Sequence, residues 1–299
     1  MEGDIIDLLL QLKKEQLTPI DLSLEDIKGI IMNVLLGGSD TSAAMVIWSM
    51  TILIKNPKAM KKVQEEIRNL IGNKGIVNED DIQNMSYLRA VIKETLRLFP
   101  PIPLLIARES MKKSTLEGYE LQPRTIVYVN AWAITRDPEI WENPEEFMPE
   151  RFLNSDIDFK GQDYEFIPFG AGRRGCPAMA LGVASVELAL SNLLYAFDWE
   201  LPYGLKKEDI DINGRPGITF ILVSSPHFSR LDATCGGVKR GILLGIGRGV
   251  SLETWGASPE RWTCFGRTVG CLGRKSYKTK PHTRVSGRFA RAPLQGESQ

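Results

Sequence analysis

Apolar residues dominate the chain over residues 24–56, and this stretch predicts one long helix. Ser23 and Asp26 have capping-box spacing at its start, where a serine and an acid three residues later satisfy each other's backbone amides. Asp40 lies near the middle of the stretch, and an aspartate at the centre of a membrane span costs about 3 kcal/mol. We therefore expect a long buried helix here and not a membrane span.

Three further helices follow from helical spacing and from prolines at their ends. Pro57 suits the first turn of a charged helix that ends near Gly72. Residues 86–99 carry apolar side chains at helical spacing, and two prolines then end the helix because proline cannot continue the hydrogen-bond ladder. The last apolar helix is predicted over about residues 178–197.

The pattern between these helices favours strands and an ordered loop. Residues 104–109 and 119–130 alternate or carry β-branched side chains on either side of a turn at Gly118, which predicts short strands. Residues 137–162 are rich in proline, glutamate and aromatics without periodicity, and indicate a meandering loop. The predicted fold class is mainly α with a minor β-sheet.

Charge and glycine content divide the chain at about residue 223. Lys+Arg and Asp+Glu both total 37, so nothing in the overall charge points to a nucleic acid partner. From residue 225 onward there are 13 basic against 4 acidic residues, and glycine is frequent. We expect one domain over residues 1–223, followed over 224–299 by a divergent, basic, Gly/Arg-rich tail without order.

The strongest chemical signal is the segment Pro168-Phe169-Gly170-Ala171-Gly172-Arg173-Arg174-Gly175-Cys176. Gly170 and Gly172 permit a tight loop whose amides favour a thiolate at Cys176, the form of cysteine that binds metals. Arg174 can meet an anion, and Phe169 can pack against a flat ring. A lone cysteine is more often a small buried apolar residue, but these neighbours favour a metal ligand.

The pattern Phe169-x-x-Gly172-x-Arg174-x-Cys176 resembles the haem-binding signature of the cytochrome P450 family. The resemblance implies the C-terminal haem-binding half of that fold, with Cys176 as the axial ligand to the iron of haem b. It also implies a basic residue for the second haem propionate at Arg108. Ala178 departs from the glycine usual in the family. The implied cofactor-binding residues are Cys176, Arg174, Arg108, Phe169, Gly170 and Gly172.

Glu94 and Arg97 form an ExxR pattern that in isolation is an ordinary ion pair on a solvated helix face. Arg151 follows in Pro149-Glu150-Arg151-Phe152, in the family's order and approximate spacing. The resemblance implies that the three charges form a buried network that locks the meander beneath the haem. Arginine suits this role because its planar fork pairs a carboxylate bidentately.

The long helix carries Gly37-Gly38-Ser39-Asp40-Thr41-Ser42 in its interior, where each glycine costs about 1 kcal/mol relative to alanine. Thr41 can donate back to the Gly37 carbonyl and bend the helix. An ordinary core helix is the simpler interpretation. The segment resembles the family's oxygen-activation motif, which implies proton delivery by Asp40 and Thr41. By the same resemblance, the substrate pocket includes Leu35, Gly37, Gly38, Ile102, Leu104 and Leu105.

The resemblance implies a plant microsomal-type haem-thiolate monooxygenase that inserts one oxygen atom of O₂ into a small apolar substrate. Its electrons come from NADPH through a separate flavoprotein, NADPH–cytochrome P450 reductase. A complete family member would sit at the cytosolic face of the endoplasmic reticulum membrane through an anchor that we do not find in this chain. The alternative is a truncated, non-catalytic fragment unable to hold haem, because half a core exposes a large apolar face.

Overall fold

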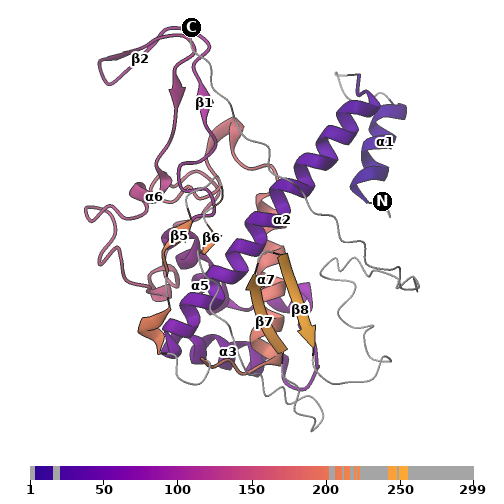
Figure 1. Ribbon diagram of the computed structural model, residues 1–299, viewed down its shortest axis with the longest axis vertical. Coiled ribbons are helices and arrows are strands. Elements are labelled where there is room, and N and C mark those ends of the chain that lie inside the picture. Colours follow the sequence, from indigo (N-terminus) through magenta and orange to yellow (C-terminus); the bar gives the residue numbers. More distant parts are fainter. Residues whose placement is uncertain are drawn as a thin grey trace, which may run out of the picture. The chain divides into compact units, whose positions relative to one another are not determined.

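The computed structural model describes residues 4–15, 21–201, 206–210, 212–215, 219, 221–222, 242–247 and 249–254. Its helices are α1 (Ile5–Glu15), α2 (Leu24–Lys55), α3 (Pro57–Ile71), α4 (Glu79–Ile82), α5 (Ser86–Leu98), α6 (Ala131–Ile134) and α7 (Met179–Ala196), with short 3-10 turns η1 (Pro149–Phe152), η2 (Gly172–Arg174) and η3 (Lys207–Asp209). Figure 1 shows a mainly helical chain in which α2 is the longest element. The predicted fold class is confirmed.

The core lies where α3, α5 and α7 pack against the C-terminal half of α2 (Figure 1). Each of these helices contributes fully buried apolar side chains, because a helix with apolar residues three and four apart buries one continuous face. The residues with no exposed surface include Leu53, Val63, Ile67, Leu88, Val91, Leu190 and Leu194. The helices that will carry the site are therefore held by one shared core.

The predicted helix ends agree with the structure to within a residue or two. Ser23 and Asp26 form the complete capping box at the start of α2. Pro57 opens α3, and Gly72 ends it at φ +56°, a backbone conformation that glycine adopts without strain. The structure adds α1, α4 and α6, which the hydrophobic pattern did not predict.

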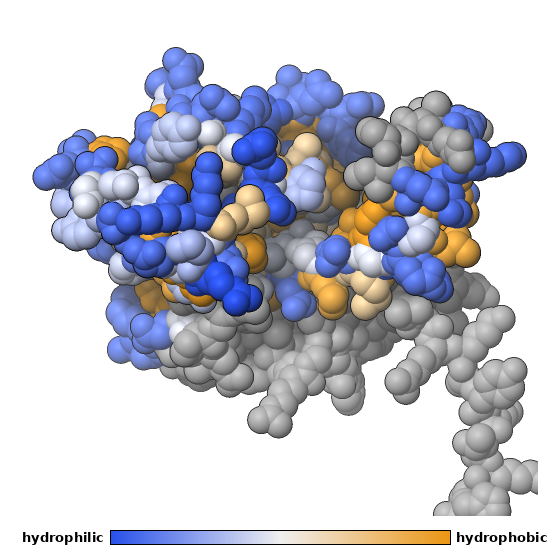
Figure 2. Space-filling view, turned by 90° about the horizontal axis from the view of Figure 1, so that it is seen from above, coloured by the Kyte–Doolittle hydropathy of each residue, from blue (hydrophilic) through white to orange (hydrophobic). Residues whose placement is uncertain are grey.

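The prediction of a long buried helix is correct for only half of α2. Ala44 to Ile54 supply core side chains, whereas large apolar side chains earlier in α2 are exposed, with Leu36 at 67%. Figure 2 shows apolar surface gathered on the side where Figure 1 draws α1 and the start of α2. By length and composition α2 and α7 could each cross a membrane, a test that core helices of soluble proteins also pass.

The strands form separate antiparallel pairs, not one sheet. β1 (Arg108–Glu109) pairs with β4 (Ile126–Val127), and β2 (Ser114–Leu116) pairs with β3 (Tyr119–Leu121) around the predicted turn at Gly118. Both predicted strands were too long: only Arg108–Glu109 of residues 104–109, and only Tyr119–Leu121 and Ile126–Val127 of residues 119–130, form strands. A third pair joins β5 (Gly214–Arg215) and β6 (Ile221–Leu222).

The expected tail lies largely outside the described residues. Within it the structure describes β7 (Ile242–Gly247) and β8 (Gly249–Thr254), which pair as an antiparallel hairpin.

Candidate functional site

The cysteine loop runs from Phe169 to Cys176, directly before α7. The Cys176 amide donates to the Phe169 carbonyl at 2.9 Å, and this bond closes the loop on itself. Gly170 (φ +73°) and Gly172 (φ +66°) adopt left-handed backbone conformations, which favour glycine. The side chain of Cys176 is exposed. The loop therefore presents the thiol at the surface, where a ligand can reach it.

Two glycines that the sequence did not single out allow this loop to close. A Cβ on Gly175 would lie 3.3 Å from the Gly172 carbonyl oxygen. Gly161, in the meander, has φ +81°, and a Cβ there would lie 3.1 Å from the Gly170 carbonyl oxygen. Both positions need glycine because a neighbouring stretch of backbone lies too close to leave room for a Cβ atom. For Gly161 no local sequence signal exists, since its neighbour lies in a different segment of the chain.

The segment that contains Ile102, Leu104, Leu105 and Arg108 lies against the cysteine loop. The Arg108 guanidinium donates to the Arg174 carbonyl at 3.1 Å. The Leu105 side chain lies 3.9 Å from the Cβ position of Gly170, and Leu105 has a positive φ of +51° that is strained for a branched residue. The structure thus brings together predicted propionate, pocket and ligand residues.

The predicted ring-packing residue Phe169 is half-buried beside the loop. Its ring meets that of Phe159 edge to face, with centroids 5.5 Å apart. Arg174 is exposed beside Cys176. A thiol, a neighbouring aromatic ring and two guanidinium groups match what a flat macrocycle with an iron centre and carboxylate substituents requires. The residues present therefore fit haem.

Glu94 and Arg97 are both completely buried in α5 and form a bidentate pair. Arg97 Nε donates to Glu94 Oε2 at 2.8 Å, and Nη2 donates to Oε1 at 2.9 Å. The remaining Arg97 protons reach the carbonyls of Thr135 at 2.8 Å, Pro144 at 2.7 Å and Glu146 at 3.1 Å. A buried charge is tolerated only when its hydrogen bonds are satisfied, and here they are.

Arg151 completes this network from η1. Its Nε donates to Glu94 Oε1 at 3.1 Å, and its side chain is 10% exposed. The Met148 amide donates to the same oxygen at 2.9 Å. The Glu94 carboxylate therefore ties α5 to the meander at both a side chain and a backbone amide, as expected for the network of Glu94, Arg97 and Arg151.

Trp141 packs against the network and was not predicted. Its ring centroid lies 5.3 Å from the Arg97 guanidinium and 5.9 Å from that of Arg151. The ring is buried and also meets Phe152 and Phe166. A cation over an indole face gains electrostatic stabilisation that grows as water is excluded. Only the tertiary structure reveals this contact, because the strands β1 to β4 and the helix α6 separate Trp141 from α5 along the chain.

The segment over residues 37–42, which resembles the family's oxygen-activation motif, lies in the exposed half of α2. The Thr41 hydroxyl donates to the Gly37 carbonyl at 2.6 Å, as predicted, and Ser39 makes the same bond to Leu35 at 2.6 Å. Leu35, Gly37, Gly38 and Asp40 are exposed. Despite its glycines, α2 continues without interruption through this segment (Figure 1). The network and the cysteine loop are thus assembled, while the residues of this segment face outward.

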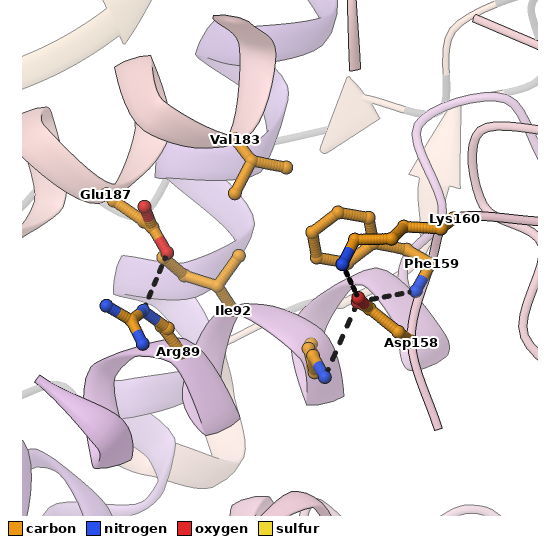
Figure 3. A pocket seen from close by; sticks show the side chains of 8 residues that line it. Arg89, Ile92, Asp158, Phe159, Lys160, Val183 and Glu187 are labelled. Atoms are coloured by element: carbon orange, nitrogen blue, oxygen red, sulfur yellow. Dashed lines mark hydrogen bonds and ion pairs between the residues drawn. The ribbon is translucent and has the colours of Figure 1, made fainter. Parts of the chain in front are cut away.

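A cavity of about 320 Å³ opens between α5, the meander and α7, lined by Arg89, Ile92, Lys93, Asp158, Phe159, Lys160, Val183 and Glu187 (Figure 3). Glu187 lies 3.6 Å from Arg89, and burial raises the pKa of the Glu187 carboxyl. On the other wall, Asp158 pairs with Lys160 at 3.1 Å and Lys93 at 3.5 Å. Each charged side chain around the cavity has a partner of opposite sign.

The chain belongs to the cytochrome P450 family, because residues 2–227 match the family model described as cytochrome P450. Its sequence is 50% identical to cytochrome P450 71A1 of Persea americana over 73% of this chain and 43% of that protein. It is 54% identical to both cytochrome P450 71B37 of Arabidopsis thaliana and 5-OH-xanthotoxin synthase of Pastinaca sativa, over 72% of this chain and 43% of each.

Among solved structures, a zebrafish cytochrome P450 with abiraterone matches with a TM-score of 0.66 and 28% identity, over 76% of this chain and 52% of that one. The chain thus spans about half the length of the cytochromes P450 that it resembles. These matches establish the family and the fold, and both agree with the resemblance found in the sequence.

Proposed function

We propose that this chain forms the haem-thiolate part of a monooxygenase, with Cys176 as the iron ligand. The observation that carries the proposal is the exposed Cys176 thiol, on a loop closed by the hydrogen bond from the Cys176 amide to the Phe169 carbonyl. When bound, a thiolate-ligated haem iron supplies the activation of dioxygen and the insertion of one oxygen atom into an organic substrate. The protein's own residues supply the ligand, the binding groups and the protons.

Arg108 and Arg174 are proposed to hold the two haem propionates. Arg108 reaches the cysteine loop through the Arg174 carbonyl, which places its guanidinium next to the site. Phe169 and the glycines of the loop are proposed to line the haem face around Cys176. Glu94, Arg97 and Arg151 act through the meander that packs below the loop, and they are not expected to touch substrate.

Asp40 and Thr41 are proposed to hold and pass protons at their carboxyl and hydroxyl groups. Thr41 donates its own proton to Gly37, so its oxygen lone pairs remain able to accept from a water molecule. Leu35, Gly37, Gly38, Ile102, Leu104 and Leu105 are proposed to line a pocket for a small apolar substrate. The relatives' names do not fix which substrate this chain takes.

The electrons are proposed to come from NADPH through a flavoprotein reductase, and the complete enzyme is proposed to act at the cytosolic face of the endoplasmic reticulum. The cytochrome P450 family assignment and the plant relatives support both proposals.

A second candidate function is a non-catalytic fragment. Exposed apolar side chains on α1 and the first half of α2 favour it, because such a surface promotes association.

The carbon monoxide difference spectrum of the reduced, haem-supplemented chain tests the proposal and separates the two candidates. A thiolate-ligated haem gives a red-shifted Soret band, and Cys176→Ala should abolish it. The matched control replaces Cys235, Cys264 and Cys271 by alanine and should leave the band unchanged. Absence of the band in the wild-type chain would favour the fragment, whereas its persistence in Cys176→Ala would reject Cys176 as the iron ligand.

A further inference from the structure

Helix α5 carries Glu94 and Arg97 but begins without a side-chain cap of its own. Its N-cap residue is Met85, which cannot accept a hydrogen bond from the first free amides. The Glu66 carboxylate of α3 takes that place. It accepts from the Tyr87 amide at 2.8 Å and from the Leu88 amide at 2.9 Å, and the Ser86 hydroxyl lies at 3.2 Å. A negative charge at this end is also favoured by the helix dipole.

Two other side chains of α3, Gln64 and Arg68, cap the end of α7, the helix that follows the cysteine loop. Arg68 donates to the carbonyls of Leu194 at 3.3 Å and Phe197 at 3.1 Å. Gln64 donates to the same two carbonyls at 3.2 and 2.9 Å. A cation suits the carbonyl end of a helix for the reason that an anion suits the amide end.

The loop after α3 makes further bonds to the last turns of α7. The Asn192 amide group exchanges two hydrogen bonds with the Val77 backbone, both at 3.1 Å. The Tyr195 hydroxyl donates to the Gly72 carbonyl at 2.9 Å and accepts from the Gly75 amide at 3.1 Å. The end of α7 is therefore fixed to α3 and to the loop that follows it.

We propose that Gln64, Glu66 and Arg68 form a clamp, called here the α3 clamp, that sets the spacing between α5 and α7. Through α5 it positions the Glu94 network, and through α7 it positions the helix joined to Cys176. Glu66 is thus a positioning residue for the site, beyond the function proposed above. Its neighbour Glu65 serves as the control, since it is exposed and, within the described part of the chain, pairs with Lys61 alone, across 3.7 Å.

Residue-resolved hydrogen exchange on the haem-free full chain tests the clamp, so the result does not depend on haem binding. Glu66→Ala should accelerate exchange of the Tyr87 and Leu88 amides about tenfold or more, since charge-assisted bonds to both are lost. The deciding readout is the Met148 amide, which donates to Glu94 at the far end of α5. It should also exchange faster, whereas Glu65→Ala should change none of the three amides.

An unchanged Met148 amide in Glu66→Ala would show a cap that acts only on the first turn, and the clamp would be rejected. Equal exchange in Glu66→Ala and Glu65→Ala, or unprotected Tyr87 and Leu88 amides in the wild-type chain, would reject it as well. If Glu66→Ala does not fold, Glu66→Gln takes its place. The same amides should then exchange faster by a smaller factor, because glutamine keeps one acceptor oxygen. Arg68→Met should accelerate amide exchange in the last turn of α7. Unchanged exchange there would show that Arg68 does not hold the end of α7.

Discussion

The Glu94 network and the Asp40–Thr41 segment are both groups of polar side chains on helices, but they differ in burial and in partners. Glu94 and Arg97 have no exposed surface, and Glu94 accepts bonds from Arg97, Arg151 and the Met148 amide. Asp40 is exposed, and the Thr41 side chain bonds within its own helix. The described residues thus complete the supporting network, while the proposed proton-delivery segment faces outward.

This difference follows from how polar groups reach their partners. A buried ion pair is stable only if every lone pair and proton is satisfied, so the network exists only with the meander in place. A threonine that bonds to its own helix needs no other segment. Breaking the network should therefore destabilise this chain much more than changing the α2 segment.

Breaking the bidentate pair should have the largest effect. Arg97→Leu leaves Glu94 buried without its main partner, and we expect the free energy of unfolding in urea to fall by about 3–5 kcal/mol. Arg97→Lys keeps the charge without the planar fork, so its free energy of unfolding should lie between those of Arg97→Leu and wild type. The exposed Lys61→Ala is the control. A loss for Arg97→Leu as small as that of Lys61→Ala would contradict a buried, stabilising network.

Removing the second arginine should cost less. In Arg151→Met the carboxylate keeps both bonds from Arg97 and the one from Met148, so we expect a loss of about 2 kcal/mol in urea unfolding. If Arg151→Met were as damaging as Arg97→Leu, the two arginines would contribute equally and the bidentate pair would not be the centre of the network.

A matched pair of threonines compares the two regions directly. Thr95 in α5 is fully buried and donates to the Val91 carbonyl at 2.8 Å, the same bond that Thr41 makes in α2. Thr95→Val should cost about 1 kcal/mol, and Thr41→Val should stay within about 0.5 kcal/mol. Equal losses in denaturant unfolding would mean that burial does not separate the two regions.

The smallest expected effect is a gain in stability. Burial raises the pKa of Glu187, so the folded chain holds this proton to higher pH than the unfolded chain, and stability falls as the pH rises between the two pKa values. Glu187→Gln removes that loss and should stabilise the chain at neutral pH by less than about 1 kcal/mol, with no gain below about pH 4. Unfolding midpoints across this range test it, with the exposed Glu65→Gln as control. Destabilisation at neutral pH would show that the Arg89 pair outweighs the burial cost.

The sequence by itself determined the features that depend on nearby residues. The capping box at Ser23, the proline that opens α3 and the Thr41 bond to Gly37 all join residues within four positions of each other. The cysteine loop is equally local, because its glycines and its closing bond lie within eight residues. Family resemblance, carried by the same short motifs, added the network of Glu94, Arg97 and Arg151.

Only the tertiary structure decided which of these groups is buried and which unpredicted residues support them. Glu66 caps a helix that begins twenty residues later, and Arg68 reaches carbonyls more than a hundred residues away. Trp141 and Gly161 likewise matter through neighbours from other segments. Hydrophobic spacing reports which face of a helix is apolar, but not whether another element covers it. For that reason α2 was predicted as a helix correctly and as a buried helix only in part.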